Sequence, residues 1–160
     1  MKVITINNLH KRFDRLSALD GVSFDLAQGE VMGLFGHNGA GKSTLIKTIL
    51  GIIEPTSGEV AVMGVSPNSK PGHAQRHQIG YLPENVSFYD QLTGLEILTF
   101  FARLKGFGKN DAHRLLKKLG LEHAMNRKVK TYSKGMRQRL GLSQAMLGSP
   151  RLLLLDEPTV

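Results

Sequence analysis

The sequence predicts an α/β fold with antiparallel strands near the N-terminus and a block of helices inserted late in the chain. Three observations lead to this prediction. Short alternating or all-apolar runs, bounded by glycine and proline, indicate strands. A glycine-rich turn at residues 36–41 leads into a segment with helical spacing. Beyond about residue 90 the apolar residues follow a helical period, until the all-leucine run 152–155 indicates a return to a buried strand.

The first part of the chain contains the elements of the α/β core. Residues 3–6 and 22–26 alternate between apolar and polar side chains and predict two antiparallel strands. Between them, a turn is expected at Lys11, Arg12, Phe13 and Asp14. Residues 31–35 are apolar around an internal glycine and predict a buried strand. The elements expected next are a helix over 42–50 ended by Gly51, a strand over 60–63 and a strand over 79–82 stopped by Pro83.

The second part of the chain is mostly helical until its last residues. Helical spacing covers 92–107, 111–119 and 134–147, and residues 152–155 form a buried strand. We therefore expect one domain over residues 1–160, with its core and β subdomain at about 1–89 and 150–160 and its helical subdomain at about 90–149. The chain stops at Val160 directly after a strand, which predicts a domain truncated at its C-terminus.

Composition excludes several classes of site. The 160 residues include no cysteine, which excludes disulfides, thiolate metal sites and cysteine nucleophiles. No apolar run approaches the roughly 18 residues of a membrane span. The net charge of +8 is uneven, because residues 103–151 hold 13 Lys and Arg against two acidic residues. This basic block either meets an anionic partner or is a solvated helical surface.

The glycine-rich turn carries the most specific motif. It matches the P-loop pattern G-x-x-x-x-G-K-[ST], in which backbone N–H groups and a helix N-terminus surround phosphate oxygens. Lys42 would reach the β- and γ-phosphates, and the Ser43 hydroxyl would bind Mg²⁺. The residues expected to bind ATP here are Gly36, His37, Asn38, Gly39, Ala40, Gly41, Lys42, Ser43 and Thr44.

Two carboxylates follow the leucine strand. In a P-loop site, an acidic residue at the end of a buried strand holds Mg²⁺ from the side opposite the loop. We expect Asp156 to take this role, largely through water. Glu157, one residue further, is the candidate general base that polarises the attacking water.

Three segments together resemble an ABC ATPase over essentially the whole chain: residues 36–44, the segment 132–139 (YSKGMRQR) and Asp156-Glu157-Pro158. The middle segment stands where that family carries its L-S-G-G-Q signature. Ser133 and Gly135 match the signature, whereas Lys134 and Met136 depart from it. The resemblance implies that Ser133 and Gly135 contact the γ-phosphate of an ATP held by the opposite subunit of a head-to-tail homodimer.

The resemblance also implies two further site residues. Phe13 stands where the family places an aromatic ring that stacks on adenine. Glu84 stands where the family usually has a glutamine that contacts Mg²⁺ and the lytic water. A carboxylate oxygen can still bind Mg²⁺, but the added negative charge leaves the details of activation open. The expected protein is a cytoplasmic ATPase, peripheral at the inner face of the cell membrane, that works with an integral-membrane permease.

Several segments resemble a narrower group, the NosF-type ATPases of the transporter that matures the copper sites of nitrous oxide reductase. These segments are 33–39, 80–89 (GYLPENVSFY), 101–106 and 129–142. This resemblance implies a role in denitrification and a periplasmic copper-maturation protein as a partner within the complex.

The sequence also allows other functions. One is an exporter ATPase for other cargo, and another is a non-transport ABC ATPase that acts on nucleic acid or ribosomes, which the basic block supports. The second usually requires long insertions or a second ATPase domain, which are missing here, so nucleic acid is not the expected partner. A P-loop kinase or GTPase ranks last, because no N-K-x-D motif is present. For a truncated chain we expect weak turnover or none.

Overall fold

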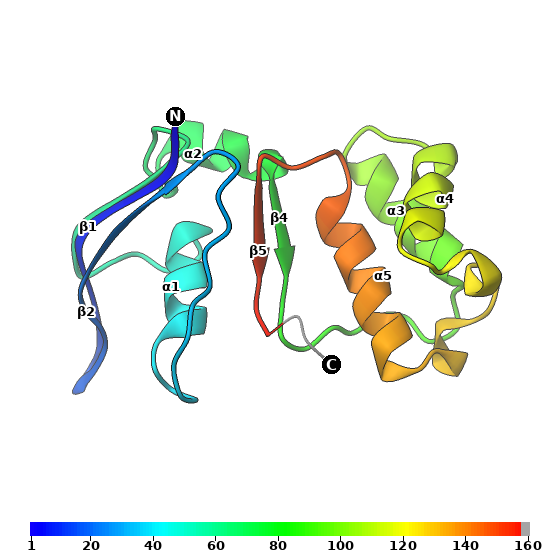
Figure 1. Ribbon diagram of the computed structural model, residues 1–160, viewed down its shortest axis with the longest axis horizontal. Coiled ribbons are helices and arrows are strands. Elements are labelled where there is room, and N and C mark those ends of the chain that lie inside the picture. Colours follow the sequence, from blue (N-terminus) through cyan, green and yellow to red (C-terminus); the bar gives the residue numbers. More distant parts are fainter. Residues whose placement is uncertain (158–160) are drawn as a thin grey trace. The chain divides into compact units, whose positions relative to one another are not determined.

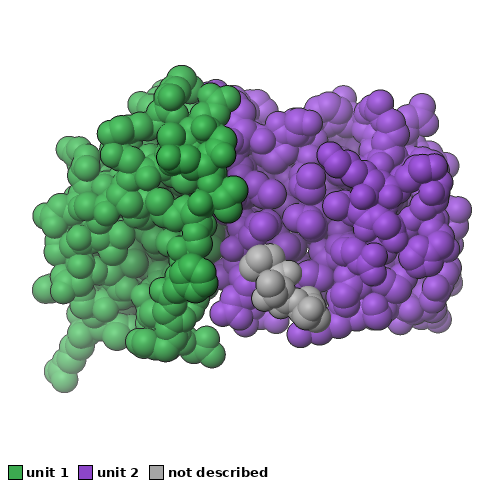
Figure 2. All heavy atoms as spheres, in the orientation of Figure 1, with its two compact units in different colours: residues 1–76 green, residues 77–160 purple. Residues whose placement is uncertain are grey.

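A computed structural model describes residues 1–157 of the chain. The chain forms two compact units, Met1–Arg76 and His77–Val160 (Figures 1 and 2). Pro158, the last residue of the acidic motif, lies outside the described residues. None of the helices in residues 1–157 has the length and apolarity needed to cross a bilayer.

The first unit is built on a three-stranded antiparallel sheet in the order β2-β1-β3. Its strands are β1 (Lys2–Phe13), β2 (Leu16–Ala27) and β3 (Ser57–Val62). In β1 the apolar residues Ile4, Ile6 and Leu9 are buried. A bulge at residues 7–8, where Asn8 has φ 46°, restores the inward direction between Ile6 and Leu9. The antiparallel pairing predicted for residues 3–6 and 22–26 is confirmed.

Helix α1 (Lys42–Ile49) packs against this sheet and is followed by α2 (Lys70–Gln75). The buried apolar residues of α1 are Leu45, Ile46 and Ile49, which follow helical spacing. The helix ends where Gly51 takes a φ of 67°, which only glycine adopts without strain. The predicted helix over 42–50 and its glycine stop are confirmed.

Two expectations for the first unit are wrong. The turn between β1 and β2 is made by Asp14 and Arg15, so Lys11 to Phe13 extend the strand. Residues 31–35 form no strand, and Val31 and Phe35 are 100% and 96% exposed. An apolar run becomes a strand only where a neighbour accepts its backbone hydrogen bonds, and no segment among residues 1–157 pairs with this one.

The second unit combines a parallel strand pair with three helices. Strands β4 (Ile79–Leu82) and β5 (Leu152–Leu155) pair in register from Ile79↔Leu152 to Leu82↔Leu155. Helix α5 (Lys134–Met146) lies beside β4, and the backbone of Ala145 approaches Gly80 so closely that a Cβ there would collide with its carbonyl oxygen (Figure 1). The strands predicted over 79–82 and 152–155 are confirmed.

Helices α3 (Gly94–Leu104) and α4 (Lys109–Lys118) complete this unit with α5. The chain between α4 and α5 makes two 3₁₀ turns, Glu122–Ala124 and Val129–Thr131; a third, Arg76–Gln78, precedes β4. Thr93 caps α3 in a capping box with Glu96, and the backbone N–H of Thr93 keeps the pKa of the Glu96 carboxyl below its usual value. The helices share one apolar core, made of Leu95, Ile97, Leu98, Ala102, Ala112, Leu116, Leu121, Ala124, Met125, Val129, Tyr132, Leu140 and Leu147.

The buried face of α3 can be tested by truncating one leucine on each side of the helix. Leu98 is fully buried, so we expect Leu98→Ala to lower the free energy of unfolding by about 2–5 kcal/mol. Leu104 on the same helix is 69% exposed, and Leu104→Ala is expected to stay within about 0.5 kcal/mol of the wild type. Urea denaturation measures both, and equal losses would contradict this placement of α3.

Candidate functional site

The phosphate loop, residues 36–43, is held in place by glycine backbone conformations. Gly39 and Gly41 have φ of 85° and 89°, a region that side chains other than glycine enter only with strain. Space also requires glycine at position 41, because a Cβ there would collide with the carbonyl oxygen of Ala18 in β2. The loop therefore rests directly on the antiparallel hairpin of the first unit.

The start of α1 is left open for an anion. Gly41 is its N-cap residue and supplies no side-chain hydrogen bond. The first backbone N–H groups of the helix have no partner within the helix, and the helix dipole adds partial positive charge at the same place. Lys42, Ser43 and Thr44 begin this helix, and all three are half-buried. This arrangement suits the phosphate groups of a nucleotide.

Lys42 closes the loop on itself. Its Nζ donates hydrogen bonds to the carbonyl oxygens of Gly36, at 2.6 Å, and His37, at 3.1 Å. Within the loop, the Ala40 N–H donates to the His37 carbonyl oxygen, and the His37 Nδ1 donates to the Asn38 carbonyl oxygen at 2.8 Å. The ammonium group therefore lies over the loop, where a phosphate would exchange its carbonyl partners for phosphate oxygens.

Phe13 ends β1 at the tip of the hairpin. Phe13 is 43% exposed, so part of this aromatic residue is available to a stacking partner. The Nζ of Lys11, two residues earlier on the strand, lies 4.9 Å from the ring centroid. Lys11 pairs with Leu19, the neighbour of the Ala18 that contacts Gly41. The structure thus brings the aromatic ring and the phosphate loop to the same end of the first unit.

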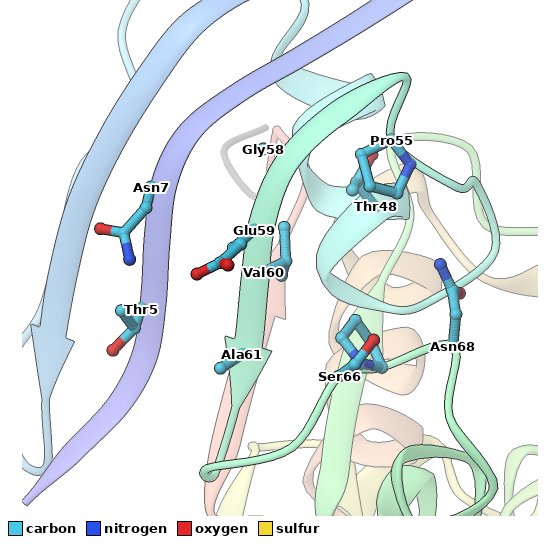
Figure 3. Close-up of a pocket in the computed structure, with 11 residues that line it drawn as sticks. Thr5, Asn7, Thr48, Pro55, Gly58, Glu59, Val60, Ala61, Ser66 and Asn68 are labelled. Carbon is cyan, nitrogen blue, oxygen red and sulfur yellow. The ribbon is translucent and has the colours of Figure 1, made fainter.

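A cavity of about 350 Å³ in the first unit lies elsewhere (Figure 3). Its lining includes Thr5 and Asn7 of β1, residues 58–61 of β3, and Thr48 in the last turn of α1. The phosphate loop is at the first turn of that helix, and none of its residues lines the cavity. The hydroxyl of Thr48 already donates to the carbonyl oxygen of Thr44 at 2.9 Å. The phosphate loop and this cavity are therefore separate features of the first unit.

The candidate carboxylates of the second unit follow the ends of its two parallel strands. Glu84 follows β4 and is exposed, whereas Asp156 follows β5 and is only 5% exposed. The backbone N–H of Asp156 donates to the carbonyl oxygen of Leu82 at 2.9 Å, which joins the two strand ends. Burial raises the pKa of Tyr81 on β4, and the Asp156 carboxylate raises it further.

Glu157 has a φ of 50°, which places a non-glycine residue in the left-handed region. Such a conformation costs about 1–3 kcal/mol and is concentrated at functional sites. The side chain of Glu157 is exposed, unlike that of the preceding Asp156. The two neighbouring carboxylates therefore have different surroundings, as expected if one holds a metal and the other acts on water.

The candidate metal ligands are oxygen donors, which are the ligands that Mg²⁺ prefers. Among residues 1–157 no three His, Asp or Glu side chains gather into a cluster of their own that would hold a metal. Mg²⁺ in nucleotide sites needs no such cluster, because one or two protein oxygens, waters and substrate phosphates complete its coordination. Each unit offers oxygens of the required kind: Ser43 in the first unit, and Glu84 and Asp156 in the second.

Ser133 and Gly135 stand at the start of α5. The Ser133 hydroxyl accepts a hydrogen bond from the backbone N–H of Met136 at 3.2 Å, so it caps the helix. A hydroxyl that accepts can still donate, which leaves its proton for an external oxygen. Ser133 and Lys134 are exposed, and a Cβ on Gly135 would meet no atom within 4 Å. This helix start is open to a ligand.

Sequence reasoning missed three contributors to these sites. Ala18 acts through its backbone and so gives no signal in its side chain. Lys11 had a weak signal, since it shares a strand face with Phe13. The ion pair between Asp90 and Arg137 joins residues that are 47 positions apart, and no pattern in the sequence indicates it.

Comparisons with known proteins agree with this geometry. A family model described as ABC transporter matches residues 19–160. An uncharacterized ABC transporter ATP-binding protein of Bacillus subtilis, YdbJ, is 41% identical over 158 residues, covering 98% of this chain and 51% of the relative. The bacitracin transport ATP-binding protein BcrA of Bacillus licheniformis is 37% identical over 158 residues, with the same coverage of 98% and 51%. The chain thus spans about half the length of the curated relatives it matches.

Solved structures give the same result. The ATP-binding subunit of an ABC transporter superposes with a TM-score of 0.84 at 33% identity, covering 99% of this chain and 67% of that one. An ATP-binding cassette of an ABC transporter in its ADP conformation superposes with a TM-score of 0.86 at 26% identity, covering 100% and 70%. The chain therefore belongs to the ABC transporter family, and its fold is that of the family's ATP-binding domain.

Proposed function

We propose that this chain binds and hydrolyses ATP as part of the ATP-binding subunit of an ABC transporter, and so drives a membrane permease. The observation that carries the proposal is the start of α1. There Gly41, in a left-handed conformation, leaves the first N–H groups without a side-chain cap, and the Lys42 ammonium group lies against the phosphate loop. Phe13 would stack on adenine, and Gly36, His37, Asn38, Gly39, Ala40, Gly41, Ser43 and Thr44 would surround the phosphates.

The carboxylates complete the proposed catalytic site. Bound Mg²⁺ would neutralise the charge that develops on the phosphates. Ser43 and Asp156 would hold it, with Glu84 as a further ligand in place of the usual glutamine. Glu157 would accept a proton from the attacking water, and its exposed, left-handed position keeps it separate from the buried Asp156.

The proposed active form is a head-to-tail homodimer. The γ-phosphate bound by the opposite subunit would accept hydrogen bonds from the hydroxyl of Ser133 and the backbone N–H of Gly135. The Ser133 hydroxyl only accepts a hydrogen bond within α5, so its proton is available, and the helix start adds partial positive charge. ATP binding would close this dimer and hydrolysis would open it. The protein would work from the cytoplasmic face of the membrane, bound to its permease.

A narrower proposal concerns the cargo. The segments 80–89 and 129–142 support a role in maturing the copper sites of nitrous oxide reductase, with a periplasmic copper-maturation protein in the same complex. The alternatives are an exporter ATPase for other cargo and an ABC ATPase that acts on nucleic acid or ribosomes. The basic surface of the second unit is the feature that supports the last alternative.

Replacing Lys42 tests nucleotide binding. Lys42→Ala removes the charge over the loop, and we expect ATP turnover by the full-length protein to fall by about 10²–10³-fold. Lys47→Ala, which removes an exposed lysine from the last turn of the same helix, is the matched control and should leave turnover unchanged. Steady-state phosphate release measures both. Normal turnover by Lys42→Ala would refute the assignment of the loop.

Replacing Glu157 separates binding from hydrolysis. Glu157→Gln keeps the size of the side chain but cannot take up a proton, so we expect hydrolysis to fall by about 10²–10⁴-fold while ATP still binds. The full-length variant should then accumulate as a closed dimer with ATP, visible by size-exclusion chromatography. Glu122→Gln, which changes an exposed glutamate of the second unit, should keep the wild-type turnover and should not accumulate as a closed dimer. Unchanged turnover in Glu157→Gln would exclude Glu157 as the base.

The copper proposal can be tested in cells. Disrupting the gene should leave nitrous oxide reductase without its full copper content, as measured by metal analysis of the purified reductase. The full-length gene should restore the copper, whereas a copy carrying Lys42→Ala should not. A fully metallated reductase in the disrupted strain would reject the copper role and leave the ATPase proposal intact.

A further inference from the structure

We propose that the ion pair between Asp90 and Arg137 fastens the segment carrying Glu84 to the helix start carrying Ser133, so that the two move as one body. Both residues are positioning residues and touch no substrate themselves. The inference rests on the proposed function, since it assigns Glu84 to the subunit's own ATP and Ser133 to the ATP of the opposite subunit.

The first attachment is the ion pair itself. The Nη2 of Arg137, in the first turn of α5, lies 2.8 Å from the Oδ1 of Asp90, and the two side chains are 28% and 55% exposed. The backbone of Asp90 is also held, because its carbonyl oxygen accepts a hydrogen bond from the Lys130 N–H at 3.1 Å. Asp90 therefore has a fixed position from which its carboxylate can orient Arg137.

The second attachment lies one turn further along α5. Gly141 is four residues after Arg137 and shares its face of the helix. A Cβ at Gly141 would lie 2.8 Å from the Leu82 side chain and 3.0 Å from that of Val86. Leu82, Val86 and Asp90 are therefore all held against α5, and Glu84 lies between Leu82 and Val86 in the sequence.

Further contacts hold the chain that leads into Ser133. The Val129 N–H donates to the Leu92 carbonyl oxygen at 2.8 Å. The buried hydroxyl of Tyr132, the residue before Ser133, donates to the Ala124 carbonyl oxygen at 2.8 Å, and its ring closes over Gly94 at the start of α3. Ser133 consequently has little freedom to move without the segment that precedes α3.

The consequence is a link between two nucleotides. If Glu84 shifts when its own ATP binds, Ser133 shifts with it and changes its fit to the γ-phosphate in the opposite subunit. Linkage requires the reverse effect to be equal in free energy. The exposed ion pair contributes little to the stability of the fold, so its removal should loosen this link without unfolding the unit.

The experiment uses the full-length protein and measures kcat and KM for ATP. We expect Arg137→Ala and Asp90→Ala each to lower kcat by about 3- to 30-fold, with KM changed by less than about 2-fold. Arg137→Lys, which keeps the charge, should retain most of the wild-type kcat. The double variant Asp90→Ala/Arg137→Ala should fall no further than either single variant. Lys117→Ala, which breaks the 3.0 Å ion pair with Glu122 in the same unit, is the control and should not change kcat.

A second measurement does not depend on turnover. Upon ATP binding, amide hydrogen exchange should slow together in residues 83–90 and 133–139 of the wild type, and in only one of the two segments in Arg137→Ala. The proposal is overturned if the single variants keep the wild-type kcat, if their losses add in the double variant, or if the two segments respond independently in the wild type. A wild-type protein that binds no ATP would refute the proposed function, and this inference with it.

Discussion

The contact between Gly41 and the carbonyl oxygen of Ala18 fixes where α1 begins, and the phosphate loop depends on it. Gly41 combines a left-handed φ of 89° with a neighbour that leaves no room for a side chain. Because Gly41 is held between the hairpin and the helix, the end of the loop that precedes it is fixed to the hairpin. The hairpin thereby sets the position of the loop and, through Phe13 at its tip, the position of the aromatic ring.

Sequence patterns predicted most elements because each of these elements carries its own local signal. The period of apolar residues gave α1, β4 and β5 nearly to the residue, and Gly51 marked a helix end by its backbone freedom. The prediction of a strand at residues 31–35 was wrong, because apolar character indicates that a segment avoids water but does not identify the segment with which it pairs. The hairpin turn was misplaced by a few residues, since Lys11 and Arg12 look like turn residues but their backbone hydrogen bonds continue the ladder.

In the candidate site too, local features were predictable from the sequence and contacts between distant segments were not. The phosphate loop was predictable from eight consecutive residues, because its chemistry is local backbone geometry. Asp156 and Glu157 were predictable once a phosphate loop was known, but the left-handed conformation of Glu157 was not. Contacts between distant segments, such as Asp90 with Arg137, depend on the packed fold and leave no periodic trace in the chain. Sequence therefore indicates candidate groups for the chemistry better than it indicates how those groups are held.

The hydrogen bonds from Lys42 to the carbonyl oxygens of Gly36 and His37 have a consequence for the hydration of its ammonium group. An ammonium group in open water would have to shed its hydration shell when phosphate arrives. Here two backbone oxygens already replace part of that shell, so entry becomes a swap of one set of oxygens for another. The lysine thereby joins the start of the loop to the first turn of α1, and a bound anion would compete with this internal connection.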